Sequence, residues 1–164
     1  MSGENVTPID KNKAAIQRHA NGDDYLPQIP EGEYRVAFDY YETTYRFGKN
    51  AKLILHFHIA DKGEYFELPV SRWYSVKNIG TEPGRNGNFK VLGQTSILLI
   101  EYLNCFPSAG RPARLDRVPM DLWPRHQYLA RVTNVRNNHK QQDLPHGLQY
   151  SRIESLIGVA KSND

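Results

Sequence analysis

The chain has 164 residues, of which 39% are hydrophobic and 24% are charged, and its net charge is +3. This length fits one folded domain with tails, and this composition excludes an intrinsically disordered protein. No apolar run approaches the roughly 20 residues that cross a bilayer, and the N-terminus lacks the basic-then-apolar order of a secretory signal. We therefore expect a cytoplasmic protein, without a disulfide because Cys105 is its single cysteine.

The charges are divided unevenly along the chain. Residues 1–70 hold 8 Lys or Arg and 11 Asp or Glu, a net charge of −3, whereas residues 71–164 hold 13 and 7, a net charge of +6. A basic half predicts a polyanionic partner such as nucleic acid. The alternative is a set of scattered, solvated charges.

The first predicted elements are an arm and a hairpin. Residues 1–30 mix polar, charged and chain-breaking residues, which is typical of a flexible N-terminal arm. Beyond Gly32 every second residue is apolar, which predicts a strand with Tyr34, Val36, Phe38 and Tyr40 on one face and Tyr41 on the other. The turn signal at 46–52 and the alternation at 52–59 predict a second strand paired with the first.

The remaining elements are predicted by breakers and periodicity. Residues 64–76 read as a third strand, in which Pro69 indicates an edge, a bulge or a bend. A glycine-rich polar loop follows, and then a helix capped by Thr95 or Ser96 and stopped by Pro107. After a proline-rich loop, alternation over 126–136 and 150–157 predicts two more strands.

Five strands with one helix between the third and the fourth predict a mainly β protein. This is the element order of an OB-like Greek-key barrel, which commonly binds oligonucleotides. We expect the barrel to span residues 31–158, followed by a short tail at 159–164. An open α+β sheet is the alternative architecture.

Several segments together resemble the phage and mobile-element single-stranded DNA-binding proteins of OB-fold type. They are "EGEYRVAF", "FGKNAKLILHFHI", "VSRWYSVK", "SILLIEYL", and the closing "YLARVTNVR" and "YSRIESLI". The resemblance covers about residues 31–158 and implies a protein that binds and protects single strands in replication or recombination, without catalysis. Members of such families often end in an acidic tail that recruits partners, but this chain ends in "GVAKSND".

Catalytic and metal-binding motifs are weak. His56 and His58 share one strand face and could be two metal ligands, but no third ligand is visible. Asp39, Glu42, Glu64 and Glu67 could meet as the magnesium site of a nuclease, although acids on strands are ordinary surface residues. Neither a phosphate-binding glycine loop nor a nucleophile elbow is present. We expect neither an enzyme nor a cofactor or metal.

The aromatic residues supply the site prediction. Ten tyrosines, six phenylalanines and two tryptophans exceed the needs of a small core, so some should be exposed. Alternation puts Trp73 and Tyr74 on opposite sides, one exposed for stacking and one buried, without saying which; alternatively, both fill the core. The predicted nucleic-acid-binding residues are Arg46, Phe47, Lys49, Arg72, Trp73, Tyr74, Lys77, Arg131, Arg136 and Lys140.

Single-stranded DNA is therefore the expected partner, bound without sequence preference. RNA, a second copy of the chain and replication or recombination proteins are further candidates, and a membrane is not expected. The competing prediction is a protein-interaction module of a mobile element. In that case the arm at 1–30 and the edge near Pro69 would dock to a partner by strand addition.

Overall fold

The computed structural model describes residues 27–160 except Thr81, Gln94, Thr95, Leu115 and His139. The protein is mainly β. Its long strands are β1 (Gly32–Arg46), β2 (Asn50–Ile59), β3 (Pro69–Ser75), β7 (Gln127–Val135) and β8 (Tyr150–Val159). The short elements are β4 (Asn78–Ile79), β5 (Gly84–Arg85), β6 (Phe89–Lys90), the helix α2 (Ile97–Cys105) and the 3₁₀ turns η2 (Pro107–Ala109), η3 (Trp123–Arg125) and η4 (His146–Leu148).

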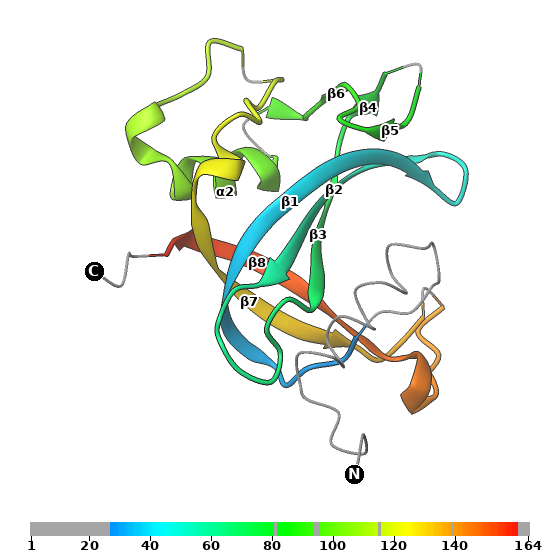
Figure 1. The fold of residues 1–164 in the computed structure, drawn as a ribbon. Coiled ribbons are helices and arrows are strands. Elements are labelled where there is room, and N and C mark those ends of the chain that lie inside the picture. The colour runs from blue at the N-terminus through cyan, green and yellow to red at the C-terminus, as the bar shows by residue number, and fades with distance from the viewer. Residues whose placement is uncertain (1–26, 81, 94–95, 115, 139, 161–164) are drawn as a thin grey trace.

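The long strands form one antiparallel sheet in the order β3-β2-β1-β7-β8, and β5 adds to β1. β1 is the curved strand that the rest of the sheet follows (Figure 1). Its first residues pair with β7, while β2 runs along most of its length. The register with β2 shifts between Phe38 and Tyr40, and such a bulge bends a strand and increases its twist. β1 is therefore the middle strand of the sheet and joins the pair β2 and β3 to the pair β7 and β8.

The two end strands, β3 and β8, approach each other without closing a barrel. In the part of the chain that is described, no ladder of backbone hydrogen bonds joins them. Glu101 of α2 bridges this seam: its carboxylate accepts hydrogen bonds from Arg72 Nη2 at 2.7 Å, Tyr74 Oη at 2.6 Å and Leu156 N at 3.2 Å. One carboxylate thus connects the helix with both end strands.

The core lies inside the curled sheet. On β2, Leu53, Leu55, Phe57 and Ile59 are fully buried, as their period of two predicts. α2 and η3 cover one end of this core. There Trp123 packs against Phe106, with ring centroids 5.1 Å apart. The backbone carbonyl of Trp123 accepts a hydrogen bond from Tyr128 Oη at 2.7 Å.

The sequence-based architecture is confirmed at the level of a mainly β chain with a helix between the third and the fourth long strands. Ser96 caps that helix by accepting a hydrogen bond from Leu99 N. The third strand begins at Pro69 and not at 64, because the preceding residues form turns in which Leu68 N donates to Tyr65 O. Proline suits the first position of a strand, since it has no backbone N–H to donate.

The predicted boundary of the N-terminal arm needs a correction. Ile29 is buried, its backbone N–H donates to Ser151 Oγ at 2.8 Å, and Ser151 N donates to Pro27 O. Residues 27–30 therefore pack on β8 as part of the folded domain. The rest of the predicted arm and residues 161–164 of the tail lie outside the described residues.

Candidate functional site

An open groove of about 840 Å³ lies between the tip of the β1–β2 hairpin and the β7–β8 connection, both on the right of Figure 1. Among the described residues that line it, four are cationic and none carries a carboxylate. The lining residues are Arg46, Phe47, Asn50, Lys52, Asn134, Val135, Arg136, Asn137, Asn138, Gln141, Leu144, Leu148, Tyr150 and Arg152. We call this the basic groove. Its charge favours an anionic ligand.

The hairpin tip presents an aromatic ring to solvent. Phe47 and Gly48 have φ angles of 56° and 77°, both left-handed, and they lie among the three residues that join Arg46 to its strand partner Asn50. A bulky residue rarely adopts this conformation, and such strained positions cluster at functional sites. Phe47 is 58% exposed, and the Arg46 guanidinium lies 5.1 Å from the centroid of its ring.

The structure distinguishes the two aromatic residues of β3. Trp73 is 37% exposed and lies 5.6 Å from the Arg46 guanidinium, on the face of β1, β2 and β3 that is turned away from the core. We call this the outer face. Tyr74 is buried, and burial raises the pKa of its phenol well above the usual value, so the neutral hydroxyl donates to Glu101. Trp73 is therefore the exposed aromatic.

Two members of the predicted binding set, Arg72 and Tyr74, make their contacts inside the protein. Arg72 makes a two-point ion pair with Glu101 and lies 4.4 Å from the ring of Tyr74. The Arg72 guanidinium is thus neutralised inside the protein, and Tyr74 is part of the core. Both residues contact Glu101 at the seam between β3 and β8, and neither is among the described residues that line the basic groove.

A second aromatic group on the outer face is absent from the predicted set. Tyr40 stacks on His56, with ring centroids 4.4 Å apart and an interplanar angle of 23°. The Arg85 guanidinium lies 4.4 Å from the Tyr40 ring, and His56 is held by Glu42 at 2.8 Å and Ser71 at 3.1 Å. Sequence alternation assigned Tyr40 to the face of Phe38. The bulge between these two residues turns Tyr40 outward, while Phe38 stays against the core.

The other predicted residues are dispersed. Arg136 lines the basic groove, 3.3 Å from Glu31, and Lys49 and Lys140 are exposed in the two loops that border it. Lys77 is exposed directly after β3, and Arg131 lies on β7 outside the groove, 3.8 Å from Glu154. The structure therefore gathers Arg46, Phe47 and Arg136 at the groove, next to Trp73.

Among the charged and aromatic residues that line the groove, Lys52, Tyr150 and Arg152 are absent from the predicted set. A signal was available, because the buried residues Ser151 and Ile153 alternate with Tyr150 and Arg152 and so turn those two outward. Lys52 extends the cationic side of the hairpin, where its Nζ donates to Ser75 Oγ at 2.7 Å.

The histidines and acids of β1 and β2 pair with one another. Glu42 binds His56, and Asp39 binds His58 at 2.7 Å. Among the described residues no group of three or more His, Cys, Asp or Glu is arranged to hold a metal ion. No helix in the described part of the chain is long and apolar enough to span a membrane.

His58 is expected to titrate above its ordinary pKa of 6.5, because Asp39 accepts a hydrogen bond from its ring against the opposing effect of partial burial. The pKa of His58 is thus higher in the folded state than in the unfolded state. The His58–Asp39 pair therefore stabilises the fold fully when the pH is below the pKa of unfolded His58. This stabilisation is lost as the pH rises through the pKa of folded His58. For so exposed a pair we expect less than about 1 kcal/mol. NMR titration of the ring protons measures the midpoint, which Asp39→Asn should lower; an unchanged midpoint in that variant would contradict the assignment.

Comparison of the chain with protein-family models, curated proteins and solved structures finds no match.

Proposed function

We propose that this chain binds single-stranded nucleic acid, DNA in the first place, across the outer face and through the basic groove. The observation that carries the proposal is the basic groove, whose described lining holds four cations and no carboxylate. Phe47 belongs to that lining, and the exposed Trp73 of the outer face lies close to the same arginine, Arg46. Aromatic stacking supplies about 1–3 kcal/mol per base, and the cations neutralise phosphates.

The aromatic residues favour unpaired bases over a duplex. Phe47 and Trp73 are accessible at a hairpin tip and on a strand face, where a base can stack only if it has left its neighbours in a double helix. Every base offers a π face, so stacking of this kind carries little sequence information. Binding without sequence preference is therefore part of the proposal.

The sheet order gives support at the level of fold. In an OB fold the ligand crosses the face of strands two and three, between the loop after strand one and the loop before strand five. The order β3-β2-β1-β7-β8 and the position of α2 suit a partly open barrel of this type, and the basic groove lies between the corresponding loops. We include in the proposal the setting that the sequence resemblance implies, replication or recombination of a phage or mobile element.

Fluorescence anisotropy with a labelled dT oligomer tests the proposal. Binding at low salt that exceeds binding to a duplex of equal length supports it, and no binding at low salt contradicts it. Equal affinity for both would indicate a general basic surface. A stoichiometric protein partner, found by co-purification and without oligonucleotide affinity, would favour the interaction module.

The double variant Arg136→Gln and Arg152→Gln should flatten the salt dependence of oligonucleotide binding. Each lost phosphate contact on a single strand reduces the slope of log K against log salt by about 0.7, so the pair should reduce it by about 1.4. The measurement is the anisotropy titration repeated at several salt concentrations. Lys62→Gln is the matched control, because Lys62 is exposed beyond the opposite end of β2; equal slopes in the double variant and the wild type would place the phosphates elsewhere.

A further inference from the structure

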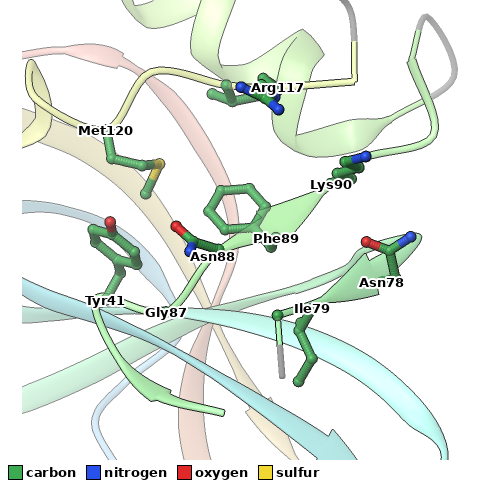
Figure 2. A pocket seen from close by; sticks show the side chains of 11 residues that line it. Tyr41, Asn78, Ile79, Gly87, Asn88, Phe89, Lys90, Arg117 and Met120 are labelled. Carbon is green, nitrogen blue, oxygen red and sulfur yellow. The ribbon is translucent and has the colours of Figure 1, made fainter. Parts of the chain in front are cut away.

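A second cavity, of about 500 Å³, lies beside the small β4–β6 sheet and shares no lining residue with the basic groove. We call it the β4–β6 pocket. Figure 2 shows the side chains of Tyr41, Phe89 and Met120 along one part of it, and the rings of Tyr41 and Phe89 meet edge to face with centroids 6.3 Å apart. With Ile79 and Val118 they give the pocket an apolar, partly aromatic wall.

In the described part of the chain, two cations and no acid line the pocket. In Figure 2, Arg117 lies above Phe89 and Lys90 to its right. Among the described residues no carboxylate is within ion-pairing distance of either cation. The neighbouring Asp116 forms its ion pair with Arg114 at 2.9 Å, and the charge of Lys90 also helps to lower the pKa of that carboxyl. The pocket is therefore arranged for a ligand that carries negative charge.

Two amides complete the lining. Asn78 and Asn88 each offer a hydrogen-bond donor and an acceptor, and neither has a side-chain partner among the described residues. Asparagine amides can recognise the polar edge of a heterocycle, because they donate a hydrogen bond to a ring carbonyl or accept one from an amino group.

The loop that carries these residues is anchored to β1. Thr43 pairs with Gly84, and its buried hydroxyl accepts a hydrogen bond from Gly84 N at 3.2 Å. A side chain at Gly87 would clash with that same hydroxyl, so only glycine lets the loop pack this closely. The pocket is thus held in shape without a ligand, as small-molecule sites usually are.

We propose that the β4–β6 pocket binds one nucleotide. The base packs against the Phe89 side of the apolar wall with its edge on the two asparagines, and the phosphate binds Lys90 and Arg117. A bare anion would leave the aromatic wall unused, and an aliphatic acid would leave the amides unused. The volume lies within the range of small-molecule sites. This site goes beyond the proposed function, and its nucleotide is either free or extruded from a bound strand.

Isothermal titration calorimetry with deoxyadenosine monophosphate tests the site. We expect one nucleotide per chain, bound more tightly than deoxyadenosine or inorganic phosphate alone. Lys90→Gln and Arg117→Gln should each weaken it roughly tenfold, as expected for the loss of one charge-assisted hydrogen bond. Arg125→Gln, at an exposed cation outside the pocket, is the matched control and should leave the affinity unchanged. Arg152→Gln, in the basic groove, tests whether the nucleotide binds there instead.

Three results would overturn the proposal: no binding at millimolar nucleotide, equal affinity for inorganic phosphate, or a loss confined to Arg152→Gln. Anisotropy with the dT oligomer on the two pocket variants identifies the source of the nucleotide. Unchanged oligonucleotide affinity indicates a free nucleotide, and a parallel loss indicates one extruded from the strand. If the proposed single-strand binding is wrong, the wild-type protein will not bind the dT oligomer in the anisotropy measurement. If the nucleotide site is wrong, the calorimetry will show it, so the two failures can be told apart.

Discussion

Replacing Glu101 with alanine is expected to lower the free energy of unfolding by about 3–5 kcal/mol, the usual cost of removing one partner of a buried ion pair. The substitution leaves the Arg72 guanidinium charged and only 13% exposed, with no counter-ion at the seam. It also removes the acceptor for the Tyr74 hydroxyl and for Leu156 N. Urea unfolding followed by circular dichroism measures the change.

Asp116→Ala is the matched control for Glu101. It also removes a carboxylate from a two-point pair with an arginine, at 2.9 and 3.1 Å, but the Arg114 side chain is 57% exposed. Exposed pairs contribute at most about 1 kcal/mol. Equal losses in the two variants would show that Glu101 does not hold the seam.

Replacing Trp73 with alanine is expected to weaken binding of a dT oligomer by about 5- to 150-fold, the equivalent of about 1–3 kcal/mol for one stacked base. The loss should be the same at every salt concentration, because no charge is removed. Stability should change little, since the side chain lies on the outer face and is partly exposed. Anisotropy and thermal unfolding of the same preparation measure both quantities.

Leu129→Ala is the matched control for Trp73. Leu129 on β7 is 36% exposed against 37% for Trp73, but β7 is not one of the three strands that form the outer face. Its removal should change neither affinity nor stability appreciably. A Trp73 variant that binds normally, or that loses affinity only as far as it loses stability, would show that the outer face is not the stacking surface.

Alternation predicts the sheet well only while the strand is regular. On β2 the period of two separates Leu53, Leu55 and Phe57 from His56 as the structure does. On β1 the alternation fails at the bulge between Phe38 and Tyr40. The extra residue there places Tyr40 on the outer face, although the period of two predicts that it shares the core-facing side with Phe38. A bulge depends on the strands that pair on either side, so local sequence does not reveal it.

The candidate site shows the same limit. Arg46 and Phe47 could be predicted because a hairpin tip is local and its turn signal is readable. The sequence predicts a phosphate contact for Arg72 because it does not reveal the ion pair with Glu101, which is 29 residues away and meets Arg72 only in the folded chain. Tyr150 and Arg152 were missed because their position opposite the hairpin follows from the order of strands in the sheet.

The double pairing of β1 also bears on how fast the chain folds. The β1–β2 hairpin closes across a short turn, with Arg46 opposite Asn50, so its contacts can form within microseconds. The β1–β7 ladder instead joins Gly32 to Val132, 100 positions further along the chain. Contacts of such long range carry a large loop-closure entropy and slow folding to the millisecond-to-second range. We therefore expect the β1–β2 hairpin to form first and the second half of the chain to dock on it later. The hairpin tip that lines the basic groove would then be folded before the other side of the groove is in place.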